Sequence, residues 1–290
     1  MTTRAQVAVV TGASSGIGRE AAKALAAQGW RVIGLGRDPQ RCADAQAEIR
    51  AASTGQDVDM IVADLAVMAD AARAAREVGA LTDHVDALLN NAGGAPKEKV
   101  VTPEGNEATF TGNHLGHFLL TERLLPLLRA AVAQRPAGAV RVVNVSSLGH
   151  QASRGLDWDD LQMLANFHPG AAYCNAKLAN ILFTRALAKR VAADGIVTHA
   201  MHPGMVDSNF AARADETMRL HFEAKKDLTI TPQEAADTLI WLATAAEPGL
   251  TNGGYFHQRA PAEVSALGQD EQSAERLWRE SEALVARAGA

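Results

Sequence analysis

The sequence predicts an α/β fold in which one doubly wound parallel sheet of about seven strands is flanked by helices on both faces. Short β-branched apolar runs alternate with helix-like segments along nearly the whole chain, and the first run leads into a glycine-rich turn. No internal repeat or linker interrupts this alternation. The 290 residues, 47% of them hydrophobic, suffice for one large core, so we expect residues 1–290 to form a single domain.

Composition argues against several classes of function. The net charge is −5 and the charges are dispersed, whereas nucleic-acid binding calls for a basic patch. Cys42 and Cys174 lack the paired spacing of a disulfide framework or a zinc site. No apolar run approaches the ~20 residues of a membrane span, and MTTRAQ leads directly into the first strand. We expect a cytoplasmic protein with no signal peptide and no membrane anchor.

The turn TGASSGIG follows the predicted strand Val7–Val10 and precedes a helix-like segment, Arg19–Gln28. In such a context Gly12 permits a sharp turn, Gly16 lets the backbone approach a pyrophosphate, and Gly18 allows close packing of helix and strand. The amino end of the helix then offers N–H groups to a phosphate. An ordinary glycine-rich turn is the alternative, but the flanking strand and helix favour dinucleotide binding.

The end of the second predicted strand, Arg31–Leu35, bears on the choice of dinucleotide. An acidic residue there would bind the ribose 2′-hydroxyl of NAD, but the chain has Gly36 and Arg37. The guanidinium groups of Arg37 and Arg19 suit a 2′-phosphate. Asp38 comes late and precedes a proline, so we expect it to shape the turn. The pattern favours NADP(H) over NAD(H).

The predicted elements continue in alternation: helices at 39–52, 66–78, 171–189, 232–246 and 270–286, strands at 58–62, 85–89, 140–145, 196–201 and 254–257, and a long helical stretch after a polar loop at 94–106. Asp64, after the third strand, could bind the adenine edge or cap the following helix. The turn Asn90–Gly93 follows the fourth strand, where parallel sheets bind ligands. His114 and His117 have no evident third ligand, so we expect packing or surface roles and no metal site.

Tyr173 and Lys177 lie four residues apart in a helix-like segment, so their side chains leave the same face one turn apart. A phenol normally titrates near pH ~10, and an ammonium nearby should lower that pKa. Such a tyrosine can act as a general acid or base. A half-buried aromatic beside a solvated lysine is the alternative for this pair taken alone.

Two apolar segments flank this helix and predict an apolar substrate. The connector at 148–170 contains Trp158 and Phe167, and the segment 205–230 mixes Met, Phe and Leu with charges, which suits a flap over a pocket. Residues 260–290 form a helical extension in this interpretation.

Six motifs together resemble the short-chain dehydrogenase/reductase family: TGASSGIG, NNAG, Asn113, Ser147, the Tyr173/Lys177 pair and HPG at 202–204. They cover about residues 5–258 in the family's order. GNHLGHFLLT and AYCNAKLANILFTRALAKR look most similar to the retinol dehydrogenase and WW-domain oxidoreductase branch. The resemblance implies a Rossmann-type sheet, a nicotinamide cofactor and interconversion of carbonyl compounds and alcohols, as in a carbonyl reductase or alcohol dehydrogenase.

By the same resemblance, Tyr173 is the acid or base, Ser147 binds the substrate oxygen, Lys177 holds the nicotinamide ribose and lowers the pKa of Tyr173, and Asn113 keeps a water in a proton relay. Ser208 lies near the position where many members have a threonine that contacts the carboxamide. Cofactor contacts are implied for Gly12, Ser14, Ser15, Gly16, Ile17, Gly18, Arg19, Arg37, Asp64, Leu65, Asn90, Ala92, Gly93, Tyr173, Lys177, Pro203, Gly204 and Val206.

Two features depart from the ordinary family pattern. The gap from Ser147 to Tyr173 is 26 positions (173 − 147), about twice the usual one, and the retinol dehydrogenase branch has a similar insertion. The membrane-anchoring segment common in that branch is not expected here, which argues against a membrane-dissolved retinoid. The expected partner is a small apolar carbonyl compound or alcohol, and a homodimer or homotetramer is plausible for the family. A catalytically silent nucleotide-binding regulator with the same fold is the alternative function.

Overall fold

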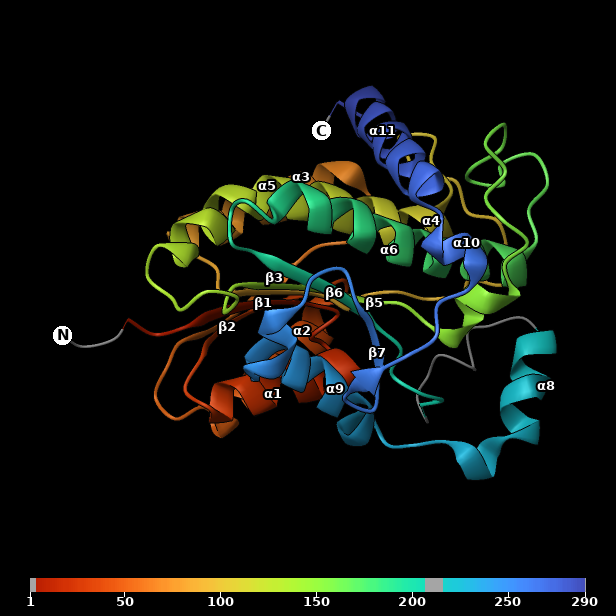
Figure 1. Ribbon diagram of the computed structural model, residues 1–290. Helices are drawn as coiled ribbons and strands as arrows, with labels where there is room; N and C mark the ends of the chain where they lie inside the picture. The colour runs from red at the N-terminus through yellow and green to blue at the C-terminus, as the bar shows by residue number, and fades with distance from the viewer. Residues whose placement is uncertain (1–3, 207–215, 290) are drawn as a thin grey trace.

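A twisted sheet forms the middle layer of the computed structural model, which describes residues 4–206 and 216–289 (Figure 1). Within these residues the sheet has eight strands in the order β3-β2-β1-β4-β5-β6-β7-β8. All neighbours pair in parallel except the last two. The strands are β1 (Val7–Thr11), β2 (Arg31–Gly36), β3 (Val58–Val62), β4 (Ala87–Asn90), β5 (Arg141–Val145), β6 (Val197–Met201), β7 (Tyr255–His257) and β8 (Ala260–Pro261).

Helices cover both faces of the sheet (Figure 1). One layer contains α1 (Gly16–Ala27), α2 (Pro39–Ala52) and α9 (Pro232–Thr244), and the other contains α3 (Met68–Leu81), α5 (Gly116–Val132) and α6 (Pro169–Val191). Strands covered on both faces should be apolar throughout, and β1 is buried at every position. Val7 and Val9 pack into the core under α3, α5 and α6, whereas Ala8 and Val10 pack into the core on the opposite face.

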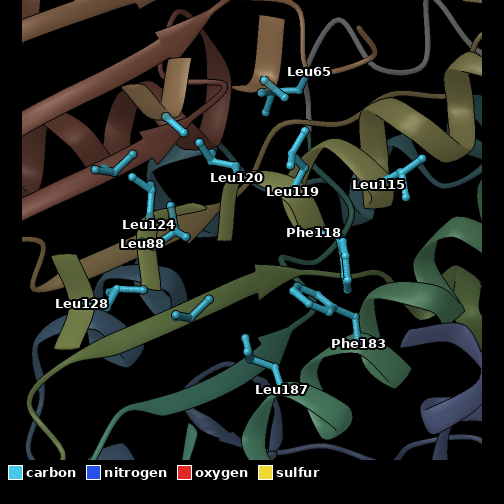
Figure 2. Packing of buried hydrophobic residues seen from close by; sticks show 14 of the residues in the cluster. Leu65, Leu88, Leu115, Phe118, Leu119, Leu120, Leu124, Leu128, Phe183 and Leu187 are labelled. Atoms are coloured by element: carbon cyan, nitrogen blue, oxygen red, sulfur yellow. The ribbon is translucent and has the colours of Figure 1, made fainter. Parts of the chain in front are cut away.

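Aromatic and leucine side chains fasten α5 and α6 to the sheet (Figure 2). Phe118 of α5 and Phe183 of α6 lie with their ring centroids 5.6 Å apart, and both belong to the same buried cluster as Leu88 of β4. This packing holds α6 against one face of the sheet. Near the amino end of the helix, Lys177 donates to the carbonyl oxygen of Val145, the last residue of β5, so this end of α6 lies beside the carboxyl end of that strand.

The predicted doubly wound fold is confirmed, with two corrections. The sheet has one more strand than the seven expected, because the chain turns after β7 and adds the two-residue antiparallel strand β8. The predicted helix at 66–78 begins only at Met68. Asp64 does not cap it: its Oδ1 accepts the N–H of Ala66, 3.0 Å away, in the turn before the helix. Asp38, as expected, shapes the turn before Pro39 and caps α2.

Further helices follow β6 and β8. The helix α8 (Glu216–Ala224) lies at the periphery, apart from the sheet (Figure 1), and exposes Leu220. Residues 207–215 of the predicted flap, including Ser208, lie outside the described residues. After β8 come α10 (Ala266–Gln269) and α11 (Glu271–Arg287), and Trp278 of α11 packs edge-on against Phe118 at 4.9 Å. Across the described ranges, we find no helix that combines the length and apolarity of a membrane span.

Candidate active site

The strand order reverses between β1 and β4, and the carboxyl ends of these two strands border one large cavity of about 1270 Å³. Such a reversal point is where open parallel sheets bind ligands, because the loops on either side diverge. The cavity extends from the glycine turn after β1 to the amino-terminal turns of α6.

The glycine turn has the geometry of a phosphate cradle. Gly12 has φ +71°, and a side chain on Gly18 would place its Cβ 2.5 Å from the carbonyl oxygen of Gly12, so only glycine fits there. Ser15 precedes α1 in an extended conformation, and its side chain makes no capping hydrogen bond. The first N–H groups of α1 are thus available to an anion at the cavity, which Ser15, Gly16 and Ile17 line.

The second turn at the cavity is held by Thr11. Its Oγ1 accepts hydrogen bonds from the backbone N–H groups of Asn91 and Ala92 at 2.8 and 2.9 Å, and the side chain of Asn91 donates to the Thr11 carbonyl oxygen at 2.8 Å. Asn90 lies elsewhere. It is buried and donates to Asn144 Oδ1 and Thr121 Oγ1. The structure therefore brings Asn91 to the cavity in place of the predicted Asn90.

Three arginines border the end of the cavity near β2, and their partners differ. Arg19 lies 3.1 Å from Glu48, whereas Arg37 has a distant contact of 4.0 Å with Asp64. Arg41, on the first turn of α2, also lines the cavity, and its guanidinium lies 3.8 Å from Asp38. The charge of Arg19 is offset by this close carboxylate. Arg37 and Arg41 are therefore the better placed pair for a phosphate.

Tyr173 and Lys177 leave α6 on the cavity side, as their four-residue spacing predicts. Lys177 is buried, with its Nζ 5.6 Å from the centroid of the Tyr173 ring and 3.2 Å from the carbonyl oxygen of Val145, to which it donates. Ser146 donates its hydroxyl to the Lys177 carbonyl at 2.7 Å and so ties β5 to α6. Ser147, the next residue, hydrogen-bonds with the Tyr173 side chain.

Asn113 lies in a π-helical turn, η1 (Thr111–Leu115), between the short helix α4 (Ala108–Phe110) and α5. Such turns interrupt α-helices mostly at functional sites. Its side-chain amide donates to the carbonyl of Gly94 at 2.8 Å and to that of Thr109 at 2.7 Å. A Cβ on Gly93 would lie 2.5 Å from Asn113 Oδ1 and 3.2 Å from Lys177 Nζ, so the two side chains meet at this glycine.

Burial shifts the pKa values of Tyr173 and Lys177 in opposite directions. Burial raises the pKa of Tyr173 to about 12, although its hydrogen bond with Ser147 acts to lower it. Burial also lowers the pKa of Lys177 to about 8. The pKa of Tyr173 in the protein on its own is therefore raised, whereas the helical spacing predicts a lowering, because burial disfavours the phenolate.

Nearly all predicted site residues line the one cavity. Those brought together are Gly12, Ser14, Ser15, Gly16, Ile17, Arg19, Arg37, Asp64, Leu65, Ala92, Gly93, Asn113, Ser147, Tyr173, Lys177, Pro203, Gly204 and Val206. Gly18 does not line the cavity but packs against the backbone of Gly12 beneath it. His114 and His117 have packing roles: both are buried, and their Nε2 atoms lie 2.9 Å from Ser281 Oγ and Thr11 Oγ1, respectively.

Sequence reasoning missed Arg41, Asn91 and His150. The position of Arg41, one turn after Arg37, was an available signal. Asn90 and Asn91 are adjacent in the chain, and the sequence does not show which of the two side chains faces the cavity. His150 lies in the 3₁₀ turn η2 (Leu148–Ala152), and its distant partner, Ser265, is brought to it only by the packing of the C-terminal segment.

The chain is similar to known proteins over most of its length. The family model described as "short chain dehydrogenase" matches residues 6–219. Mouse retinol dehydrogenase 11 is 38% identical and the alignment covers 94% of this chain and 84% of the relative; human retinol dehydrogenase 13 is 35% identical, with 96% and 83% covered. Mouse polyprenol dehydrogenase is 35% identical, with 98% and 85% covered.

Solved structures are also similar to the chain over most of its length. An uncharacterized protein from Mycobacterium paratuberculosis superposes with a TM-score of 0.76 at 29% identity, covering 97% of this chain and 93% of the other. The Pseudomonas aeruginosa RhlG/NADP active-site complex superposes with a TM-score of 0.69 at 29% identity, covering 87% and 93%.

Proposed function

Because this chain belongs to the short-chain dehydrogenase/reductase family, in its retinol dehydrogenase branch, we propose that it interconverts an apolar aldehyde or ketone and its alcohol with NADP(H). Its membership makes it an NAD(P)-dependent oxidoreductase acting on CH–OH or C=O groups. The observation that carries the proposal is that Tyr173, Ser147 and Lys177 line the same cavity as the glycine turn.

The cofactor fits the residues present. The uncapped amino end of α1 suits its pyrophosphate, and the buried Lys177 suits its nicotinamide ribose hydroxyls at the other end of the cavity. When bound, NADP(H) supplies or accepts the hydride. Asn113 holds the Gly94 carbonyl and so keeps the turn after β4 against Lys177, and in this proposal it also keeps a water of the proton relay.

The protein supplies the proton and fixes the substrate oxygen. In reduction, Tyr173 donates its phenolic proton to the carbonyl oxygen, and the Ser147 hydroxyl donates a hydrogen bond to the same oxygen. A phenol whose pKa lies at about 12 remains protonated at neutral pH, which suits the role of general acid. In oxidation Tyr173 first loses this proton through the water relay proposed at Asn113, and its phenolate then acts as the base. The proton then returns from the alcohol to Tyr173, and Ser147 again holds the oxygen.

The preference for NADP(H) rests on the arginines beside β2. Arg37 and Arg41 offer guanidinium groups whose nearest carboxylates are 4.0 and 3.8 Å away, beyond hydrogen-bond distance. A 2′-phosphate would accept hydrogen bonds from both. Arg19, the other predicted contact, would add charge to this end of the cavity only after its contact with Glu48 is weakened.

The apolar character of the substrate is supported by the outer part of the cavity. Pro96, Pro103 and Val206 line it, together with Val100 and Val101, whose surfaces are half exposed. The relatives named retinol dehydrogenase and polyprenol dehydrogenase are named for lipophilic alcohols. An apolar lining contributes roughly 25 cal/mol for each Å² of apolar substrate surface that it removes from water.

The test is a panel of aldehydes, ketones and secondary alcohols of increasing chain length, followed at the nicotinamide absorbance with NADPH, NADP⁺, NADH and NAD⁺. We expect turnover with the phosphorylated cofactor and a kcat/KM that rises with the apolar surface of the substrate. Tight NADPH binding without turnover of any compound would overturn the proposal and favour a silent nucleotide-binding regulator.

A further inference from the structure

His150 is a fully buried imidazole that the reaction above does not use. It lies between the turn that carries Ser147 and the C-terminal segment after β8. Its Nδ1 lies 2.7 Å from the carbonyl oxygen of Ser147, and the backbone N–H of Ser265 donates to its Nε2 at 3.2 Å. A backbone N–H can only donate, so Nε2 must be an acceptor. The ring proton is then on Nδ1 and is donated to Ser147.

The surroundings of His150 favour this neutral form. Burial holds the pKa of His150 below its usual value. Tyr255 of β7 packs edge-on against the imidazole at 5.1 Å between ring centroids. Ala262 donates its N–H to the Tyr255 carbonyl at 2.9 Å, so the segment leading to Ser265 is fastened to the same strand.

The Ser147 hydroxyl depends on the turn that His150 fastens. The N–H of Gly149 donates to Ser147 Oγ at 3.0 Å, and the N–H of His150 donates to the Ser147 carbonyl at 3.1 Å. The imidazole makes a second bond to that same carbonyl. Because Oγ already accepts the Gly149 N–H, its own proton is directed elsewhere, and its hydrogen bond with Tyr173 lies on the cavity side.

We propose that His150 is a positioning residue of the active site. By donating from Nδ1 to the Ser147 carbonyl while accepting at Nε2 from Ser265, it makes the orientation of the Ser147 hydroxyl depend on the C-terminal segment. This role rests on the proposed function, because Ser147 matters only if it binds the substrate oxygen. The C-terminal segment thereby contributes to the site without lining the cavity.

Two replacements of His150 separate its two hydrogen bonds. In His150→Asn the side-chain amide can still donate where Nδ1 did, whereas in His150→Gln the amide oxygen can accept where Nε2 did but no donor faces Ser147. We expect His150→Gln to lower kcat by roughly tenfold or more, since small misplacements of catalytic groups are costly. His150→Asn should restore most of that loss. The two variants should have the same dissociation constant for NADPH and the same Tm.

A second pair of variants tests the connection to the C-terminal segment. Ser265 has φ −56°, which proline also adopts, and Ser265→Pro replaces the N–H donor by a ring carbon that also pushes the imidazole out of this contact. Ser265→Ala is the matched control, because it keeps the N–H and loses only the hydroxyl that caps α10. We expect Ser265→Pro, and not Ser265→Ala, to lower kcat. In the His150→Asn background Ser265→Pro should have no further effect on kcat.

A measurement without substrate completes the test. In ¹⁵N NMR of the imidazole groups at pH 7, with the His150→Asn variant identifying the signal, we expect a neutral His150 protonated at Nδ1. A ring protonated at Nε2, a charged ring, or equal kcat values for His150→Gln and His150→Asn would overturn the inference. A substrate panel without turnover would instead overturn the proposed function, and the positioning role with it, even where the tautomer is as expected.

Discussion

The hydroxyl oxygen of Thr11 lies 2.9 Å from Nε2 of His117, and both side chains are buried. The same oxygen accepts the N–H groups of Asn91 and Ala92, while Nδ1 of His117 lies 3.1 Å from the carbonyl oxygen of Asn113. This chain of hydrogen bonds connects the end of β1, the turn after β4 and the π-helical turn. Three segments far apart in sequence thus hold one wall of the cavity.

Replacing Thr11 by valine should break the hydrogen bonds that connect β1 to the turn after β4 and to His117. Thr11→Val keeps the shape of the side chain but leaves the Ala92 N–H without its acceptor, at roughly 1–3 kcal/mol for a buried group, whereas the Asn91 N–H keeps its hydrogen bond to the Leu89 carbonyl at 3.0 Å. We expect a lower free energy of unfolding in urea and weaker NADPH binding. Thr198→Val is the matched control, because Thr198 is equally buried and its hydroxyl has no hydrogen-bond partner among the described residues. Equal losses in both variants would contradict this account of Thr11.

Replacing Tyr173 by phenylalanine should remove the proton donor alone. Tyr173→Phe is expected to lower kcat by roughly 10²–10⁴-fold, the usual contribution of general acid–base catalysis. NADPH affinity, measured by fluorescence titration, should hardly change. The other tyrosine of the chain supplies a control: Tyr255 is buried and its hydroxyl has no hydrogen-bond partner among the described residues, so Tyr255→Phe should keep turnover. Normal turnover in Tyr173→Phe would refute the assignment.

The buried ammonium of Lys177 should make stability depend on pH. Its pKa is about 8 in the folded protein and 10.5 ordinarily. Between these values the unfolded chain binds a proton that the folded chain has released, so the wild type gains stability as pH rises through this window. Below pH 8 both states are protonated, and the wild type carries the full cost of burial, about 3 kcal/mol.

Lys177→Met isolates this effect, because Asn180 still donates to the Val145 carbonyl that Lys177 leaves. The stability advantage of Lys177→Met over the wild type, measured by urea unfolding without nucleotide, should shrink by about 3 kcal/mol from pH 8 to pH 10.5. A difference that stays constant over this range would show that the folded-state pKa of Lys177 is not lowered.

Arg37 should discriminate between the two cofactors. Removing one charge-assisted hydrogen bond costs about 1.5–3 kcal/mol, so Arg37→Ala should weaken NADP⁺ binding by roughly 10- to 100-fold and leave NAD⁺ binding unchanged. Arg31→Ala is the control, since Arg31 begins β2 at the end far from Arg37 and pairs with Asp59. Equal weakening of both cofactors by Arg37→Ala would mean that the guanidinium does not recognise the 2′-phosphate.

The glycine turn, the Tyr173/Lys177 pair and the alternation of strands and helices were all predictable, because each depends on neighbours within a few positions. Local backbone geometry determines the need for Gly12 and Gly18, and the pitch of a helix determines that Tyr173 and Lys177 share a face. The choice between Asn90 and Asn91 was not predictable in this way. It depends on which of two adjacent side chains faces Thr11, and that is decided by the register of β4 against β1.

The sequence by itself determined the alternation of strands and helices, the glycine turn and the Tyr173/Lys177 pair, since hydrophobic period and glycine positions are local properties. Only the tertiary structure decided the electrostatics of the site. Burial depends on everything packed around a group, and it raises the pKa of Tyr173 where helical spacing alone predicted a lowering. The same packing brings Ser265 to His150 across more than one hundred positions, a contact that no local pattern encodes.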